Sequence, residues 1–383
     1  MFRRANKIKL AFVLPRLRNT WAFGGMETMA ASLLNNLNTD KFELSLICLS
    51  KDNAIIKQID QSRVSVHIVE QRPGLDPLLV FRLAAFFART RPTLLHTYNE
   101  GALLYVLPAA KLAMVPAVVH AEHGRIKHEK ALLTKVRILV TQLCDYVITV
   151  SDTLTNKLVQ EEGVSKEKVH TVINGVDPLR FDKKEVRRDY RRELGLTDQD
   201  WAVGTIGSLT EWKNQQLLIH AAAKTRNVKV FIAGNGPKKE ELEALIAELD
   251  VSSRVTLLGQ RSDIPEFLNA MDLFTLTSIT EGAPIALLEA MAARLPTLVT
   301  DVGGNGDIIV DNETGFLVPS NDLEAYCERL SWFEKNRLSS REMGENGRRR
   351  VEEKYSISSM VDTYDRLFHQ VLSNQNAKHQ KAY

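Results

Sequence analysis

Two glutamates on either side of a glycine-containing turn stand out in the segment SITEGAPIALLEA at residues 278–290. Glu281 is expected shortly after a buried strand, and Glu289 is expected one to two turns into the helix that follows. A helix that begins after such a turn presents free backbone N–H groups, which attract phosphate, and carboxylates accept hydrogen bonds from hydroxyls. The turn and the start of the helix are formed by Gly282, Ala283, Pro284 and Ile285. This combination predicts a site for a phosphorylated sugar.

A lysine is expected at the same edge of the sheet as the two glutamates. The segment WAVGTIGSLTEWKN predicts a strand, a turn at Gly207 and a loop that carries Lys213 to the carboxyl ends of parallel strands, where open sheets bind ligands. An ammonium group there can neutralise a diphosphate while charge moves onto a leaving group. The segment AGNGP follows the next strand, and its glycines, Gly234 and Gly236, allow close approach of a ligand to the backbone.

Two further loops in the C-terminal half were considered as parts of a site. Gln260 and Arg261 directly follow the predicted strand VTLLG, whereas Asp263 is expected to cap the next helix and is assigned a structural role. One Asp-x-Asp pair, at residues 198–200, lies in a polar loop before a strand, and this position favours a turn over a metal site.

Polar side chains also end two predicted strands of the N-terminal half. In AVVHAEHG, alternation along the strand places His120 and Glu122 on one face and His123 on the other. Because these three side chains cannot easily converge on one ion, no metal site is predicted. His96 ends TLLHTY at the same sheet edge, where it could meet an acceptor or be a core or capping histidine.

A pair of glycines, Gly24 and Gly25, follows the loop after the first strand and opens a helix. The backbone N–H groups at that helix start are again suited to an anion, and Gly24 is also considered for acceptor contact. A glycine pair alone is more often a simple turn.

The elements that position these residues alternate between short apolar runs and amphipathic segments, which is typical of α/β architecture with parallel sheets. A length of 383 residues exceeds the size of a single core, so two domains are predicted. We predict an N-terminal Rossmann-like domain at 1–177, a C-terminal one at 178–354 and a last helix at about 355–383.

The composition is ordinary for a globular protein, with 44% hydrophobic and 25% charged residues. A net charge of +3 is too small to indicate nucleic-acid binding. Three scattered cysteines, Cys48, Cys144 and Cys327, predict reduced thiols in a cytoplasmic protein. The apolar runs are too short or too interrupted to predict a signal peptide or a membrane span.

Several short motifs occur in a specific order along almost the whole chain. They are GGMET at 24–28, HG at 123–124, VSDTL at 150–154, INGVD at 173–177, GSLTEWKN at 207–214, AGNGP at 233–237, SITEGAPIALLEA at 278–290 and GG at 303–304. Together they resemble the signature of family 4 retaining glycosyltransferases, which have the GT-B fold. The resemblance implies two Rossmann-like domains with parallel sheets facing across a cleft, and a last helix that crosses back onto the N-terminal domain.

The resemblance also implies the substrates. The expected donor is a nucleotide sugar, more readily a UDP-sugar than a GDP-sugar, held mainly by the C-terminal domain. The expected acceptor is a glycan or a lipid-linked glycan in bacterial polysaccharide or glycolipid assembly. Transfer is expected to retain the anomeric configuration and to need neither a metal ion nor another cofactor. The basic helix expected at 127–143 suggests peripheral contact with the inner membrane surface.

The same resemblance implies roles for individual residues. Lys213 matches the lysine that, with an arginine, grips the donor diphosphate, but Ser208 stands at the arginine position. Glu281 and His123 match residues that contact the transferred sugar, and Glu289 matches the one that binds the ribose hydroxyls. The loop of Gln260 and Arg261 is expected to flank the nucleotide base through its backbone.

Two alternatives to a glycosyltransferase stay open at this stage. One is another GT-B chemistry, such as a nucleotide-sugar epimerase. The other is a non-catalytic subunit that binds a nucleotide sugar, which the serine at position 208 keeps in consideration.

Overall fold

The computed structural model describes residues 7–15, 25–51, 54–124, 131–225 and 227–381. The chain divides into two compact units. The N-terminal unit comprises Met1–Ile173 together with Ile357–Tyr383, and the C-terminal unit comprises Asn174–Ser356. These divisions lie four and two residues from the predicted boundaries at 177/178 and 354/355.

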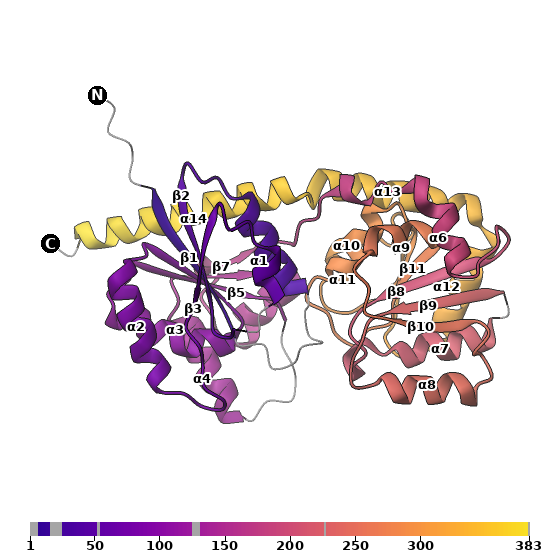
Figure 1. Ribbon diagram of the computed structural model, residues 1–383, viewed down its shortest axis with the longest axis horizontal. Coiled ribbons are helices and arrows are strands. Elements are labelled where there is room, and N and C mark those ends of the chain that lie inside the picture. The colour runs from indigo at the N-terminus through magenta and orange to yellow at the C-terminus, as the bar shows by residue number, and fades with distance from the viewer. Residues whose placement is uncertain (1–6, 16–24, 52–53, 125–130, 226, 382–383) are drawn as a thin grey trace. The chain divides into compact units, whose positions relative to one another are not determined.

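The N-terminal unit is built on a seven-stranded parallel sheet with the strand order β3-β2-β1-β4-β5-β6-β7 (Figure 1). Its strands are β1 (Ile8–Leu14), β2 (Phe42–Cys48), β3 (Val64–Ile68), β4 (Leu94–Tyr98), β5 (Ala117–Glu122), β6 (Tyr146–Thr149) and β7 (Val169–Thr171). The central strands are rich in Val, Leu and Ile because both of their faces are covered by helices. The strands predicted from TLLHTY and AVVHAEHG are present as β4 and β5.

Helices cover this sheet in two layers. The α-helices are α1 (Gly25–Asn36), α2 (Leu78–Thr90), α3 (Glu100–Leu112), α4 (Ala131–Gln142), α5 (Asp152–Asn156) and α14 (Ile357–Lys381), with short helical turns at Ala54–Gln58, Lys157–Glu161 and Lys166–Lys168. Helix α3 contacts both α2 and α4, while α14 contacts α1. Alternate residues of β4 face the two layers, since Leu95 belongs to the α2–α3 core and His96 packs on Phe368 of α14.

The last helix, predicted at about 355–383, is α14, which runs from Ile357 to Lys381. Its polar end remains helical. The reason is that Asn374 donates a hydrogen bond to the Tyr146 hydroxyl at 2.6 Å, and Gln375 binds Asp145. Polar side chains therefore fix this end of α14 to the loop before β6.

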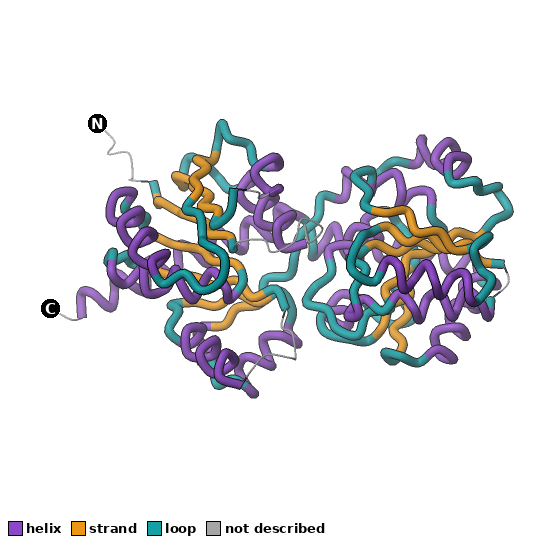
Figure 2. Tube along the Cα trace, turned by 60° about the horizontal axis from the view of Figure 1, so that its bottom comes forward, coloured by secondary structure: helices purple, strands orange, loops and turns teal. Residues whose placement is uncertain are grey.

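The C-terminal unit contains a six-stranded parallel sheet in the order β10-β9-β8-β11-β12-β13. Helices, purple in Figure 2, pack around the orange strands of this unit. Its strands are β8 (Trp201–Ile206), β9 (Val228–Ala233), β10 (Val255–Gly259), β11 (Leu273–Leu276), β12 (Thr297–Thr300) and β13 (Phe316–Val318). Its α-helices are α6 (Arg187–Glu193), α7 (Gln215–Lys224), α8 (Lys239–Glu248), α9 (Ile264–Ala270), α10 (Ile285–Ala292), α11 (Asn305–Ile308), α12 (Leu323–Lys335) and α13 (Arg337–Lys354), with 3-10 turns at Pro178–Phe181, Lys184–Val186 and Glu211–Lys213.

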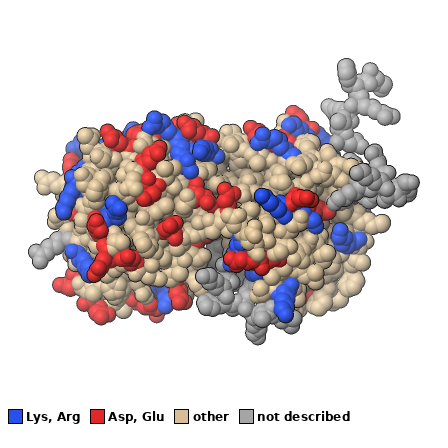
Figure 3. Space-filling view, turned by 180° about the vertical axis from the view of Figure 1, so that it is seen from behind, with Lys and Arg blue, Asp and Glu red and all other residues tan. Residues whose placement is uncertain are grey.

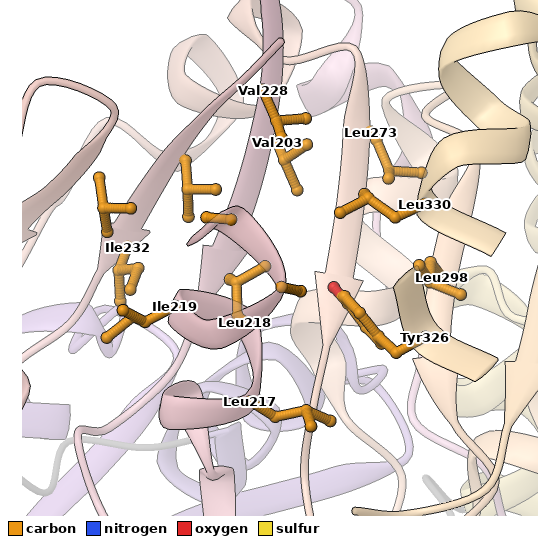
Figure 4. Close-up of a cluster of buried hydrophobic side chains, with 14 of the residues drawn as sticks. Val203, Leu217, Leu218, Ile219, Val228, Ile232, Leu273, Leu298, Tyr326 and Leu330 are labelled. Atoms are coloured by element: carbon orange, nitrogen blue, oxygen red, sulfur yellow. The ribbon is translucent and has the colours of Figure 1, made fainter. Parts of the chain in front are cut away.

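The core of the C-terminal unit fixes the strands that carry the candidate site. Val203 of β8, Leu273 of β11 and Leu298 of β12 pack with Leu218 of α7 and Tyr326 of α12 (Figure 4). Tyr326 is fully buried, and its hydroxyl lies 2.6 Å from Thr275 Oγ1, so the polar end of this large side chain is satisfied inside the core.

The molecular surface carries charges of both signs. On the face shown in Figure 3, Lys and Arg side chains are interspersed with Asp and Glu. Within the described part of the chain, no helix is both long and apolar enough to cross a membrane.

Candidate active site

An ion pair between Lys213 and Glu281 lies at the carboxyl end of the C-terminal sheet. Lys213 ends a 3-10 turn after β8, and Glu281 lies in the loop between β11 and α10. The Lys213 Nζ atom is 2.5 Å from Glu281 Oε1, and Ser278 Oγ donates a hydrogen bond to the same oxygen at 2.6 Å. The Lys213 side chain remains 24% exposed and the Glu281 side chain 7% exposed, so the ammonium is the more accessible of the two groups.

Hydrogen bonds between the two loops hold this ion pair in place. Thr277 Oγ1 donates to the carbonyl oxygen of Asn214 at 2.9 Å and to that of Lys213 at 3.2 Å. The backbone N–H of Ile279 donates to the carbonyl of Trp212 at 2.8 Å. The loops after β8 and β11 therefore form one connected structure, and the ammonium and carboxylate are positioned together.

Three glycines allow the loops around the ion pair to pack backbone against backbone. A Cβ atom on Gly303 would lie 1.8 Å from the carbonyl oxygen of Glu281, and one on Gly234 would lie 1.9 Å from that of Gly207. A Cβ on Gly236 would come within 2.4 Å of the Leu209 carbonyl oxygen. We expected Gly234 and Gly236 to make room for a ligand, and the structure shows that they first make room for the loop after β8.

Glu289 lies in the second turn of α10, eight residues after Glu281. Burial of its carboxyl group raises the pKa to about 7, against a smaller lowering by Arg180. Among the described residues, none is found to hydrogen-bond this carboxylate. A carboxylate in this condition gains from ligand hydroxyls that donate hydrogen bonds to it.

The turn before α10 is fixed by a residue that sequence reasoning did not single out. Asn174 Nδ2 donates a hydrogen bond to the carbonyl oxygen of Ala283 at 2.8 Å, and Pro284 precedes Ile285, the first residue of α10. Asn174 belongs to the motif INGVD, and this motif is the sequence feature that could have identified it as a site residue. Ser278 was missed in the same way, although it begins the segment that carries both glutamates.

Arg261 and Asp263 bind each other. The Arg261 Nε atom donates to Asp263 Oδ1 at 2.8 Å, and its guanidinium also donates to the Tyr190 hydroxyl at 2.9 Å. Asp263 is the N-cap residue of α9, as predicted, but its side chain makes no capping hydrogen bond, because its carboxylate binds arginine instead. Gln260 and Arg261 follow β10 as expected, which leaves their backbone at the sheet edge.

In the N-terminal unit, His120 and Glu122 share one face of β5, as predicted. Their side chains are buried with His120 Nε2 3.5 Å from Glu122 Oε2, and His120 Nδ1 lies 2.9 Å from Thr97 Oγ1. His123 follows the strand and packs against Tyr98 with ring centroids 5.3 Å apart. Burial lowers the pKa of His123 to about 4, so its ring is neutral at pH 7.

His96 and Gly24 are the two residues predicted to be near an acceptor, and the structure describes only the first of them. His96 is fully buried and surrounded by the rings of Phe12, Tyr98, Tyr364 and Phe368. Of the two alternatives given for His96, the structure agrees with a core histidine, because its position on β4 faces the aromatic side chains of α14. Gly24 lies outside the described residues, and Gly25 is the first residue of α1.

No metal centre is evident in the part of the chain that the structure describes. Within those ranges, no group of three or more His, Cys, Asp or Glu side chains is placed to hold a metal ion. Independence of a metal ion therefore stays a prediction.

Two family matches cover successive parts of the chain. Residues 23–180 match the family described as Glycosyltransferase Family 4, and residues 186–350 match the family described as Glycosyl transferases group 1. The two matched segments together take in most of both units.

Individual relatives agree with these matches. The UDP-Gal:alpha-D-GlcNAc-diphosphoundecaprenol alpha-1,3-galactosyltransferase of Escherichia coli is 25% identical over 390 residues, covering 97% of this chain and 99% of that protein. The N-acetyl-alpha-D-glucosaminyl L-malate synthase of Bacillus anthracis is 26% identical over 331 residues, covering 82% of this chain and 84% of that protein. The crystal structure of Anabaena HepE with UDP-glucose has a TM-score of 0.85 at 20% identity, covering 95% of this chain and 100% of the other, which establishes the fold.

The substitution Gly303→Ala should strongly destabilise the C-terminal unit. Its Cβ atom would collide with the Glu281 backbone, and the backbone φ of +54° is itself unfavourable for alanine. We expect a loss of roughly 3 kcal/mol or more in the free energy of unfolding, measured by urea denaturation. Gly195→Ala is the matched control, because φ is +68° there and the added methyl meets open space, so a loss of only about 1 kcal/mol is expected. Equal losses in both variants would contradict a backbone clash at Gly303.

The substitution Glu289→Gln should stabilise the protein at alkaline pH. The pKa of Glu289 is raised by folding, so the stability that this group contributes is present below its ordinary pKa of 4.5 and is lost as the pH rises through about 7. Glutamine does not ionise, so the difference in unfolding free energy between the variant and the wild type should be about 1–3 kcal/mol more favourable to the variant at pH 8 than at pH 4.5. This range allows for the partial exposure of the side chain at position 289. Urea denaturation at both pH values measures the difference, with the exposed Glu243→Gln as control. A gain that is the same at both pH values would rule out this titration.

Proposed function

Because the chain belongs to the group 1, family 4 glycosyltransferases of the GT-B fold, we propose that it transfers a sugar from a UDP-sugar to a lipid-linked or polysaccharide acceptor with retention of the anomeric configuration. The donor and acceptor classes are supported by relatives such as the undecaprenol-linked galactosyltransferase of Escherichia coli. The single observation that carries the proposal is the pairing of Lys213 with Glu281 at the carboxyl end of the C-terminal sheet.

Lys213 supplies positive charge to the donor diphosphate in this proposal. The bond between the anomeric carbon and the diphosphate oxygen breaks during transfer, and negative charge grows on the departing UDP. An ammonium fixed beside that oxygen stabilises the growing charge more than it stabilises the bound donor, which is the requirement for catalysis. The N–H groups at the start of α10 add to this positive potential, so we infer that transfer needs no divalent cation.

Glu281 binds and orients the transferred sugar. Lys213 and Ser278 both bind its Oε1 atom, which leaves Oε2 to accept a hydrogen bond from a sugar hydroxyl. Before the donor arrives, the carboxylate and the ammonium neutralise each other, so neither has to be moved from water when the donor binds. This preorganisation lowers the cost of reaching the reactive arrangement.

Retention is expected to follow from attack on the same face as the departing phosphate. Glu281 is engaged by an ammonium and a hydroxyl, an arrangement that suits hydrogen bonding to the sugar better than covalent attack on its anomeric carbon. The departing phosphate oxygen then accepts the proton of the attacking acceptor hydroxyl. His123, neutral at pH 7, contributes a hydrogen bond to the transferred sugar.

A second candidate function, binding of a nucleotide sugar without transfer, is favoured by one observation. Ser208 has no charge to offer a diphosphate, and its carbonyl oxygen is already bound by Gln215 Nε2 at 3.0 Å. The diphosphate would then be bound by Lys213 and backbone N–H groups alone. Turnover of a bound UDP-sugar distinguishes the two functions.

The substitutions Lys213→Met and Glu281→Gln should each reduce transfer by roughly 10²- to 10³-fold, because each removes a group that acts at the reacting centre. The measurement is UDP release from a panel of UDP-sugars with lipid-linked acceptor extract, together with thermal melting to check folding. Matched controls are Lys239→Met and Glu243→Gln on α8, an exposed pair 3.6 Å apart in the same unit, which should leave the rate unchanged. Full activity in either site variant would remove that residue from the mechanism.

The substitution Ser208→Arg should strengthen UDP binding about tenfold or more, because a charge-assisted hydrogen bond to the diphosphate is gained. Isothermal titration with UDP gives the dissociation constant, and Ser208→Gln is the control of similar length without charge. If the arginine variant binds UDP no more tightly than the glutamine variant, position 208 does not face the diphosphate.

A further inference from the structure

Exposed large apolar side chains are unevenly divided between the two units. Among the described residues of the C-terminal unit they are Leu179 and Leu338, whereas the N-terminal unit exposes a larger set. Most of that set lies on α2, α3 and α4 or on the residues directly next to these helices. Representative members are Leu75, Leu78, Phe81, Met114, Leu139 and Leu143. This surface, formed by the outward sides of α2, α3 and α4, is called the apolar face below.

Helix periodicity shows that the apolar face is a regular feature. The exposed positions of α2 include Leu78 and Phe81 and continue with alanines at 85 and 88, which gives a stripe without a polar side chain. Val136 and Leu139 of α4 and Leu143, the residue directly after this helix, repeat at helical spacing on the exposed side. Helix α3 contacts both neighbours, so the stripes belong to one layer of helices (Figure 1).

Helices α2 and α4 carry charges of one sign, whereas α3 begins at an acidic residue, Glu100. Neither α2 nor α4 contains an aspartate or glutamate. Two further arginines on them are paired: Arg82, whose side chain is 39% exposed, binds Asp76, and the buried Arg137 lies 3.1 Å from the buried Glu162. The exposed cations of the layer are Arg89, Arg91, Lys111 and Lys135.

We propose that the apolar face docks onto an anionic lipid bilayer. Apolar side chains that project from a helix layer enter the boundary between headgroups and acyl chains, and nearby cations meet the lipid phosphates. A second copy of this chain fits less well. A two-fold interface would bring Arg89 and Lys135 of both copies together on helices that offer no carboxylate to pair with them.

Docking of this face on a bilayer would add to the proposed function. Only the biological role of the docking rests on that proposed function. An enzyme that uses a lipid-linked acceptor gains from being held at the surface where that acceptor lies. The sequence suggested membrane contact through the basic segment 127–143, of which 127–130 lies outside the described residues. In the structure, the exposed apolar side chains of α2 and α4 are the better candidates for that contact.

Flotation with vesicles tests the proposal on the full chain without donor or acceptor. Vesicles of phosphatidylcholine with one quarter phosphatidylglycerol should bind the protein at low salt, and phosphatidylcholine vesicles should bind it weakly. The double variant Phe81→Ser, Leu139→Ser should lower the partition coefficient about tenfold or more. The double variant Leu179→Ser, Leu338→Ser removes equally exposed leucines from the C-terminal unit and should bind like the wild type. Arg89→Gln with Lys135→Gln should reduce both binding and its dependence on salt.

Several results would overturn the proposal. They are the absence of wild-type binding to anionic vesicles, equal binding by the Phe81→Ser, Leu139→Ser variant, and a wild-type dimer that this variant dissociates in light scattering. Thermal melting checks that the variants are folded, and UDP release with a detergent-solubilised acceptor should be unchanged in them. Vesicle binding without any turnover would instead contradict the transferase proposal and leave the docking surface in place.

Discussion

The ion pair of Lys213 and Glu281 is the constraint on which the site depends. A carboxylate that is 93% withdrawn from water needs a partner, because an unpaired charge in such a position is costly. The partner comes from a loop 68 residues earlier in the chain. Both loops must therefore hold their positions, and the hydrogen bonds of Thr277 and Ile279 do so. The close approach at Gly303 serves the same end, since it supports the backbone of Glu281 from the loop after β12.

The parallel sheet brings these loops together. Strands β8, β11 and β12 are neighbours in the C-terminal sheet, so the loops that follow them leave from the same edge. The buried residues that Figure 4 shows on β8, β11 and β12 fix the strands, and the strands fix where the loops begin. Function is then carried by loops and helix starts, where backbone N–H groups and charged side chains are accessible. The glycines of the site contribute indirectly, because they allow the backbones of those loops to pack closely against each other.

Much of this arrangement could be predicted from the sequence, because it follows from local patterns. Apolar runs predicted the strands, and the spacing of Glu281 and Glu289 around a turn predicted one carboxylate before a helix and one within it. What could not be predicted depends on contacts between side chains. His96 meets α14, more than 260 residues away, and a strand pattern does not say which layer covers which face. Asp263 is the N-cap residue of α9, as predicted, but its carboxylate is bound by Arg261, two residues away, and by the Tyr190 hydroxyl.

The two glutamates of the site handle charge differently, and the difference follows from their surroundings. Glu281 has an ammonium in direct contact, because Lys213 Nζ lies 2.5 Å from its Oε1 atom. Among the described residues, none forms an ion pair with Glu289, and burial raises its pKa to about 7 against a smaller lowering by Arg180. Folding alone thus favours the protonated form of Glu289, whereas hydroxyls that donate two hydrogen bonds favour the ionised form. A ribose would therefore stabilise the charge that folding disfavours, so ligand binding and ionisation at Glu289 are coupled. Glutamine at this position would remove the free-energy cost of burying an ionised group. It would, however, offer a single acceptor oxygen where the carboxylate offers two.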